Sequence, residues 1–159
     1  MFDKILLATD GSDTAKDAAR RVAGIQKKFD STVVIFHAEK HYYVPQEETP
    51  RSFPFIDLGL INANMVNEME EMQQAFKVWG KKMLRETAEI FEKQGLEVET
   101  RLITDESPVD YVKEVTKDGA YDLVAVGCKG HHSKLKEIFM GSVATKISNN
   151  AYCDVLIVR

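Results

Sequence analysis

The chain has 159 residues, of which 44% are hydrophobic and 29% are charged, and its formal net charge is −4. A chain of this size can bury a hydrophobic core without disulfides or a structural metal. The acidic balance argues against nucleic acid or an anionic membrane surface as a partner, since both favour basic proteins. No apolar run is long enough to span a membrane and no signal peptide precedes the first strand, so we expect a cytoplasmic protein.

The first part of the chain predicts a strand, a helix and a second strand. Residues 4–9 and 32–38 are nearly continuous apolar runs, which are typical of strands buried on both faces of a parallel sheet. Between them, the turn Asp10-Gly11-Ser12 offers a serine as helix cap, and apolar residues then recur at helical spacing as far as Phe29. This is a β-α-β unit, for which we expect a right-handed crossover.

Residues 40–62 break this pattern, because they combine three prolines with several aromatic residues. A connection of this length is either a functional lid or an irregular surface excursion. Apolar residues then recur at alternating spacings of four and three, which predicts one helix over residues 64–94, closed by Gly95. The repeating residues are Met65, Met69, Met72, Phe76, Trp79 and Met83. We expect most of them to pack in the core, and a coiled-coil seam or partner surface is the alternative.

The second half of the chain predicts three more strands, over residues 97–104, 122–126 and 154–158. A helix begins at Ser107-Pro108, where a capping residue precedes a proline at the first helical position, and another covers residues 142–149. In total, five strands alternate with about four helices. This order indicates an α/β fold with an open parallel sheet.

Ligands of such sheets bind beyond the carboxyl ends of the strands, where the strand order reverses. Asp10 follows the first strand, Ala38 ends the second, and Gly127-Cys128-Lys129-Gly130 follows the fourth. Gly141-Ser142 then begins a helix, whose first N–H groups and dipole favour an anion. Glycine lets backbone amides approach that anion closely. Two glycine turns around one helix start therefore suit a polyphosphate.

Other chemistries lack their motifs. The chain has no Walker phosphate loop, no dinucleotide-binding glycine pattern after the first strand and no nucleophile elbow. Asp10-Gly11-Ser12-Asp13-Thr14 lacks the later glycine and glutamate of a calcium loop. Cys128 and Cys153 match no metal-ligand spacing, and the adjacent His131-His132 cannot easily face one ion. We therefore predict no metal site and no catalytic residues.

The chain resembles the universal stress protein family across its whole length. The resemblance rests on Thr9-Asp10-Gly11-Ser12, Gly127-x-x-Gly130, the segment 135–143 and the final strand 154–158. In that family the pattern G-x2-G-x9-G-[ST] marks members that bind ATP. The resemblance implies one domain over residues 1–159 with a Rossmann-like three-layer sandwich, in which helices cover both faces of a sheet of order 3-2-1-4-5. It also implies a homodimer that pairs the C-terminal strands.

By position, the resemblance implies a site for ATP or AMP, with or without Mg²⁺, and Thr9 at the end of the first strand is one of its expected residues. Asp10 would bond the ribose, and Ala8 with Ala38 would line the adenine site. The implied phosphate cradle comprises Gly127, Gly130, Gly141, Ser142 and Val143, and Lys129 inside the turn either touches a phosphate or is solvated. Two features depart from the family pattern: ten residues instead of nine separate Gly130 from Gly141, and Glu106 stands where glycine is common. We expect the extra residue in an exposed loop and the Glu106 side chain in solvent.

The implied function is a dimeric, nucleotide-binding module of the stress response or of signalling, with an unidentified protein partner. The alternatives are a nucleotide-independent interaction module of the same fold and a slow ATPase. We do not expect a dedicated enzyme, because Asp10-Gly11-Ser12-Asp13 matches neither loop used by nucleotidyl transferases of this wider fold.

Overall fold

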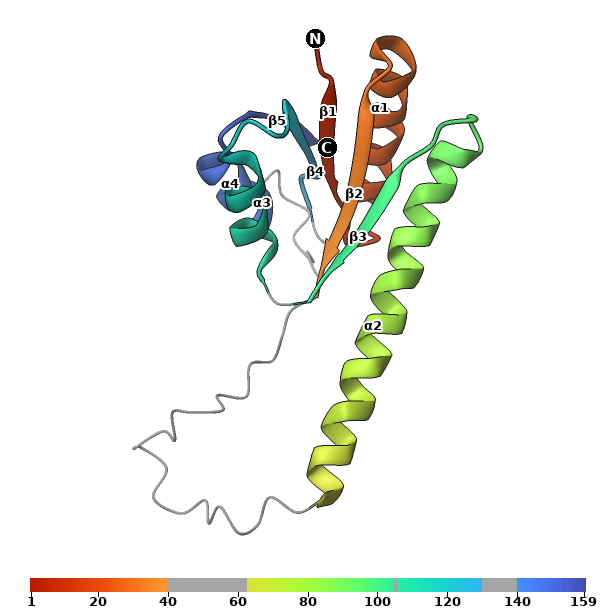
Figure 1. Cartoon of the computed structure of the whole chain (residues 1–159), viewed down its shortest axis with the longest axis vertical. Helices are drawn as coiled ribbons and strands as arrows, with labels where there is room; N and C mark the ends of the chain where they lie inside the picture. Colours follow the sequence, from red (N-terminus) through yellow and green to blue (C-terminus); the bar gives the residue numbers. More distant parts are fainter. Residues whose placement is uncertain (40–62, 105, 130–139) are drawn as a thin grey trace.

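The computed structural model describes residues 1–39, 63–104, 106–129 and 140–159, with the side chains of the long helix from Glu71 onward. One parallel sheet has the order β3-β2-β1-β4-β5 (Figure 1). Its strands are β1 (Lys4–Ala8), β2 (Thr32–Ala38), β3 (Glu99–Ile103), β4 (Leu123–Gly127) and β5 (Asp154–Val158). Every pairing between neighbouring strands is parallel, which confirms the predicted sheet and its order.

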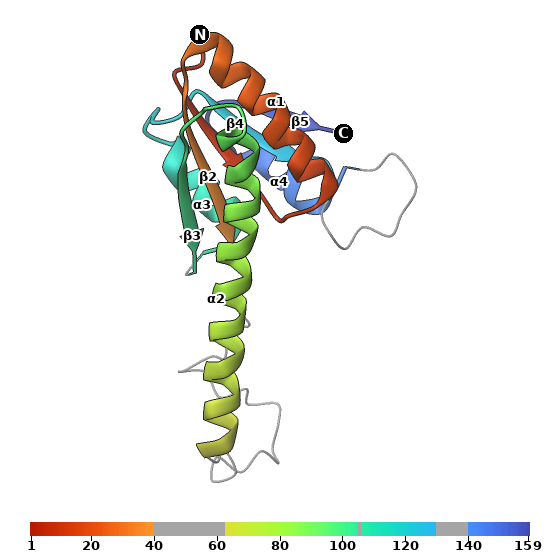
Figure 2. The same ribbon diagram turned by 90° about the vertical axis from the view of Figure 1, so that its right-hand side faces the viewer.

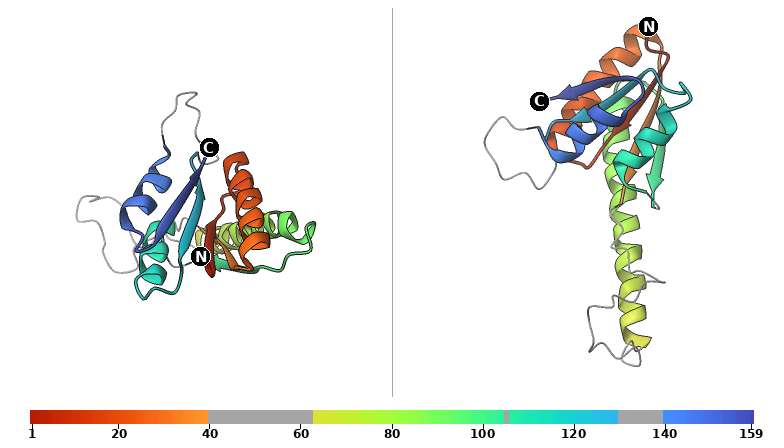
Figure 3. Two further views of the ribbon diagram at one scale, coloured as in Figure 1. Left: turned by 90° about the horizontal axis from the view of Figure 1, so that it is seen from above. Right: turned by 90° about the vertical axis from the view of Figure 1, so that its left-hand side faces the viewer.

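Four described helices cover the two faces of this sheet. α1 (Asp13–Phe29) and α2 (Ala63–Glu92) pack on one face, and α3 (Pro108–Thr116) and α4 (Ser142–Asn150) pack on the other. The view from above in Figure 3 shows the two pairs on opposite sides of the strands. The three-layer sandwich is therefore confirmed.

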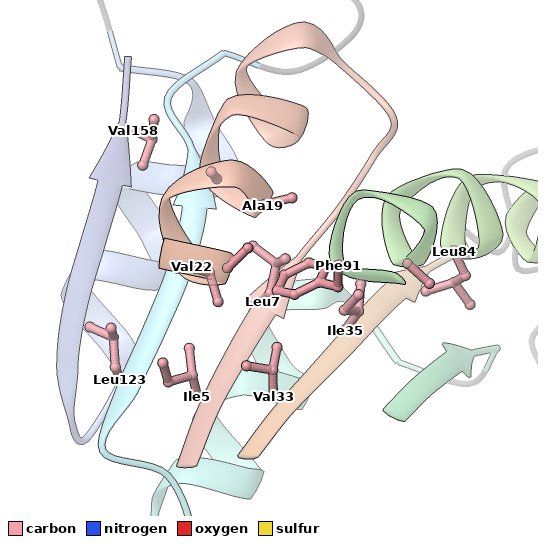
Figure 4. Packing of buried hydrophobic residues seen from close by; sticks show 14 residues of the cluster. Ile5, Leu7, Ala19, Val22, Val33, Ile35, Leu84, Phe91, Leu123 and Val158 are labelled. Carbon is pink, nitrogen blue, oxygen red and sulfur yellow. The ribbon is translucent and has the colours of Figure 1, made fainter. Parts of the chain in front are cut away.

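The core consists of two hydrophobic clusters, one on each face of the sheet. Side chains of a strand point alternately to its two faces, so Ile5 and Leu7 join the cluster under α1 and α2, shown in Figure 4. Leu6 and Ala8 join the cluster under α3 and α4. Because both faces of β1 are covered, its sequence is continuously apolar rather than alternating.

The end of α2 follows from the conformation of Gly95. This glycine has a φ of 72°, the left-handed region that commonly closes a helix. The Leu96 N–H donates to the Phe91 carbonyl oxygen at 3.1 Å, which satisfies one of the last carbonyls of the helix. The helix accordingly stops at Glu92, close to the predicted end at residue 94.

α2 is longer than the sheet that it covers. Its 30 residues correspond to about 45 Å at the usual rise per residue. The seven residues of β2 span only about 23 Å. The first half of α2 therefore projects beyond the carboxyl ends of the strands (Figure 2). None of the described helices is both long enough and apolar enough to cross a membrane. Residues 40–62, which we interpreted as an irregular loop, lie outside the described residues.

Asp122 ties the first residues of the chain to the start of β4. Its Oδ2 accepts hydrogen bonds from the backbone N–H groups of Lys4 and Asp3, both at 2.8 Å. These bonds favour the charged carboxylate and lower the pKa of Asp122 below its ordinary value. The resulting stabilisation is present above the pKa of an unfolded aspartate, about 3.9. It is lost as the pH falls through the lower folded-state value.

We therefore expect Asp122→Ala to lower the free energy of unfolding at pH 7 by the order of 1 kcal/mol, because the bonds are exposed to water. The difference from the unmodified protein should narrow in urea titrations as the pH falls below about 3.9, and it should disappear once the pH is below the folded-state pKa. Asp118→Ala removes an exposed aspartate on another part of the surface and should cause neither effect. A deficit that persists unchanged at low pH contradicts this account of Asp122.

Candidate functional site

The carboxyl end of β1 lies where the strand order of the sheet reverses. β1 is flanked by β2 on one side and by β4 on the other. The Thr9 N–H donates to the Phe36 carbonyl oxygen at 2.9 Å, which extends the pairing with β2 by one residue. Open α/β sheets bind ligands in the crevice beyond such a position. The predicted site residues follow β1, β2 and β4 at this edge.

Small apolar residues line this edge on the α3 and α4 face. We call Ala8, Ala38, Ile103, Val109 and Val143 the apolar shelf. Ala8 is 9% exposed, and the other four are half-buried against the second core cluster. A surface that is apolar and still partly accessible suits the flat ring of a small ligand. The structure thus brings three predicted residues, Ala8, Ala38 and Val143, to the same face of the sheet.

Asp10 is held at the start of the turn that follows β1. Its Oδ1 accepts the Ser12 N–H at 3.0 Å, and the residue is half-buried. Side chains alternate along an extended strand, so the Asp10 side chain faces the opposite side from Thr9, the residue before it. The carboxylate is therefore held by the local turn, and carboxylate oxygens can accept hydrogen bonds from hydroxyl groups.

Thr9 points to the opposite face of the sheet. It is 6% exposed, and its Oγ1 lies 2.9 Å from the Thr87 Oγ1 of α2. The Thr9 carbonyl oxygen lies 2.8 Å from Nδ1 of the buried His37. A carbonyl only accepts, so this His37 nitrogen carries the proton. The Thr9 side chain thus belongs to a polar network under α2 and not to the apolar shelf.

The turn after β4 is attached to the start of α1. A Cβ atom at Gly127 would lie 2.6 Å from the Thr14 Oγ1 and 2.7 Å from the Ala15 nitrogen, so no larger residue fits there. The Lys129 carbonyl oxygen accepts from the Ser12 Oγ at 3.1 Å and from the Thr14 Oγ1 at 2.5 Å. The Lys129 N–H donates to the Thr14 Oγ1 at 3.3 Å. A phosphate contact from Lys129 would consequently come from its side chain.

The sequence did not indicate these roles of Ser12 and Thr14. Ser12 was identified only as a helix cap, and its Oγ does accept the Ala15 N–H at 3.3 Å. Thr14 lies 115 positions before Lys129, and no local pattern signals a contact over that separation.

The start of α4 comes close to the end of β4. The Gly141 N–H donates to the Cys128 carbonyl oxygen at 2.7 Å, which joins the two ends of the intervening segment. Among the described residues, no side chain caps this helix, whereas Ser12 caps α1 and Ser107 caps α3. Ser142 is exposed and Val143 is half-buried. The first N–H groups of α4 therefore have no side-chain cap from the described part of the chain and are placed to donate to an anion. Gly130 lies outside the described residues.

Glu106 differs from its expected exposure. The residue is half-buried and its Oε2 atom is shielded from water, so our prediction that it faces solvent is wrong. It precedes Ser107, whose Oγ accepts the Asp110 N–H at 3.1 Å at the start of α3. A carboxylate near a helix start is favoured by the helix dipole, which gives this glutamate a structural reason to turn inward.

The two cysteines are free thiols, Cys128 buried and Cys153 half-buried. Within the described residues, no group of three or more His, Cys, Asp or Glu side chains could hold a metal ion. His131 and His132 lie outside that part of the chain.

Comparison with known proteins identifies the family of this chain. The sequence model of the universal stress protein family matches residues 1–159. A universal stress protein of Methanocaldococcus jannaschii is 28% identical over 159 residues, which cover 100% of this chain and 83% of that protein. The universal stress protein YxiE of Bacillus subtilis is also 28% identical over 159 residues, which cover 100% of both chains.

Solved structures share the fold. UspA from Lactobacillus plantarum matches with a TM-score of 0.74 and 17% identity, over 99% of this chain and 97% of that one. A universal stress protein from Archaeoglobus fulgidus in complex with dAMP matches with a TM-score of 0.61 and 18% identity, over 100% and 98% of the two chains. An Arabidopsis thaliana family protein with AMP bound matches with a TM-score of 0.59 and 17% identity, over 98% and 90%. A universal stress protein in complex with cAMP has a TM-score of 0.61 and 21% identity, over 99% and 97%.

Proposed function

Since the chain belongs to the universal stress protein family, we propose that it binds an adenine nucleotide at the carboxyl edge of its sheet. The observation that carries the proposal is the start of α4, which no side chain of the described residues caps and whose Gly141 N–H is bonded to Cys128, directly after β4. The apolar shelf lies on the same face of the sheet. Structural relatives with AMP, dAMP or cAMP bound support an adenine nucleotide as the ligand.

Each part of the nucleotide has a counterpart in this site. The base packs on Ala8 and Ala38 of the apolar shelf, and the Asp10 carboxylate accepts hydrogen bonds from ribose hydroxyls. The phosphates lie at the start of α4, where N–H groups and the helix dipole both favour negative charge. The residues proposed for the phosphates are Gly127, Lys129, Gly130, Gly141, Ser142 and Val143.

ATP is our preferred ligand, because two glycine turns around one helix start provide donors for more than one phosphate. Mg²⁺ would then be held chiefly by the phosphates and by water, as is usual for this ion. The net charge of −4 does not oppose a polyanion when the contacts are backbone amides.

We also propose a homodimer through β5, acting in the cytoplasm as a stress-response or signalling module. β5 is an edge strand of the sheet, and the outer side of such a strand offers unpaired N–H and C=O groups. Its central residues, Val155, Leu156 and Ile157, are half-buried in the single chain. Pairing with a second β5 would satisfy the free backbone groups and bury more of these side chains.

Ser142→Asp separates nucleotide binding from stability. Aspartate in the first turn favours the helix dipole, so the free energy of unfolding should stay the same or rise slightly. The same charge repels a phosphate, and we expect affinity for AMP and ATP to fall about tenfold, which corresponds to about 1.4 kcal/mol. Calorimetric titration of nucleotide-stripped protein measures this loss.

Ser148→Asp is the matched control for this experiment. Ser148 is an exposed residue near the other end of α4, so its replacement should leave nucleotide affinity unchanged. The unmodified protein should release heat with AMP or ATP. Absence of heat and of any thermal shift at millimolar nucleotide refutes the proposed function. Equal affinities of the two variants refute the phosphate position only.

A further inference from the structure

The projecting half of α2 carries a row of exposed apolar side chains. Met72, Phe76 and Trp79 are 51%, 42% and 44% exposed, and we call these three residues the α2 stripe. At about 100° per residue they fall within an arc of about 60° on the helix. The row continues toward the core at Met83, which is 8% exposed and packs against Gly11. Our prediction that most of the row packs in the core holds at its Met83 end and not along the α2 stripe.

The helix leaves the sheet at Gly80. A Cβ atom there would lie 2.7 Å from the Leu102 Cδ1 and 3.0 Å from the Glu39 Oε1, so the helix backbone is close to β3 and to the end of β2. One residue earlier, Trp79 still meets His37 edge-on, with ring centroids 5.8 Å apart. Further toward its start, α2 projects past the sheet, as Figures 1 and 2 both show. Among the described residues, the α2 stripe is therefore presented on an arm of the helix that projects past the sheet.

We propose that the α2 stripe pairs with the α2 stripe of a second copy of this chain, as a short antiparallel coiled coil. The alternating spacings of four and three between residues 65 and 83 make the seven-residue repeat that such pairs require. A second copy is the simplest occupant, because two identical stripes related by a twofold axis complement each other.

The charges along α2 favour the antiparallel orientation. The sequence places Glu68, Glu70 and Glu71 before the middle of the projecting arm. Lys77 follows on the projecting arm, and Lys81 lies at the point where the helix reaches the sheet. An antiparallel pair sets the acidic end of one helix beside the basic part of the other, whereas a parallel pair in register sets like charges together.

This orientation also leaves room for both domains. The repeat places the centre of the pair between Met72 and Phe76, so Met72 of one copy lies beside Phe76 of the other. Residues 69–79 overlap, a length of about 16 Å. In each copy the sheet packs against α2 only from Gly80 onward. In an antiparallel pair of helices, the two sheets therefore lie at opposite ends.

Trp79 is the only tryptophan in the chain and therefore reports on the α2 stripe directly. We expect its emission to shift to shorter wavelength as the concentration of the full chain rises, because pairing removes the indole from water. Over the same range, sedimentation should show a rise in mass. Phe76→Glu should abolish the shift in emission and lower the mass relative to the unmodified chain, while the circular dichroism spectrum remains that of the folded protein.

Val78→Glu is the matched control. Val78 is 68% exposed but lies about 130° around the helix from the centre of the α2 stripe, so this variant should associate like the unmodified chain. The measured quantity is the difference in mass between Phe76→Glu and the unmodified chain. Pairing through β5 would raise the mass of Phe76→Glu and of the unmodified chain equally, and nucleotide binding does not change the difference between them. The test is therefore independent of the proposed function.

A cysteine pair tests the orientation. Ala75 occupies a position that flanks the seam near the proposed twofold axis, so Ala75→Cys should form a disulfide between copies under mild oxidation, and Val78→Cys should not. Equal masses for Phe76→Glu and the unmodified chain overturn the inference. A short-wavelength Trp79 emission that persists on dilution also overturns the inference, because residues of the same chain then shield the indole from water. Efficient crosslinking of Val78→Cys but not of Ala75→Cys excludes the antiparallel register.

Discussion

Replacing Phe91 with alanine is expected to lower the free energy of unfolding by about 3–5 kcal/mol. Phe91 is completely buried and joins α2 to the sheet, in the same cluster as Leu7 and Ile35 (Figure 4). Its removal leaves a cavity, because these neighbours belong to a rigid parallel sheet and can relax only partly. Urea unfolding followed by circular dichroism measures the loss.

Phe29→Ala provides the control for the Phe91 variant. Phe29 is the last residue of α1 and is 37% exposed, with an edge-on ring contact to Phe2. Its replacement should lower the free energy of unfolding by about 1 kcal/mol. Similar losses for the two phenylalanines would show that the second half of α2 does not anchor the helix to the sheet.

Gly127→Ala is expected to lower the free energy of unfolding by about 1–3 kcal/mol. The added methyl group would lie 2.7 Å from backbone atoms of Thr14 and Ala15, so α1 or the β4 turn has to move. Either movement strains the bonds between Thr14 and Lys129. Because the turn leads toward the start of α4, we also expect weaker binding of AMP and ATP in the same variant.

Gly24→Ala makes the same chemical change with the opposite expected sign. A Cβ atom at Gly24, inside α1, meets nothing within 4 Å. Alanine is the better helix former, so this variant should gain about 0.5–1 kcal/mol. Thermal unfolding of the two variants side by side checks both signs. An unchanged midpoint for Gly127→Ala would mean that the α1 start and the β4 turn are not packed together.

The proposed nucleotide site and the α2 stripe meet at the ends of β1 and β2. Ala8 and Ala38 contribute to the apolar shelf on the α3 and α4 face. Their neighbours Thr9 and His37 turn to the α2 face, where Thr9 meets Thr87 and His37 meets Trp79. The alternation of side chains along a strand thus sends consecutive residues to the two surfaces.

The elements of this fold could be predicted from local patterns. The run from Lys4 to Ala8 is apolar throughout because both faces of its strand are covered, and this signal needs no partner to be identified. The starts of α1 and α3 follow from Ser12 and Ser107, which cap their own helices. The positions of Asp10, Ala38 and Gly141 at one edge then follow from the parallel order of the strands.

Residue roles that depend on distant neighbours could not be predicted in this way. The sequence marks Gly127 as part of a turn, but only the packing of α1 shows why no larger residue fits there. Thr9 belongs to the motif after β1, yet its side chain bonds Thr87 on the other face. The α2 repeat looks uniform in sequence, whereas the sheet covers Met83 and leaves Phe76 exposed.

The difference between the predictable elements and the unpredictable residue roles has a physical cause. Strand and helix patterns reflect backbone geometry and burial, which act on residues a few positions apart and leave a periodic trace in the sequence. The extent of the sheet, and which helix start meets which turn, are set by contacts between segments far apart in the chain. Those contacts depend on shape and close packing, for which no local pattern exists.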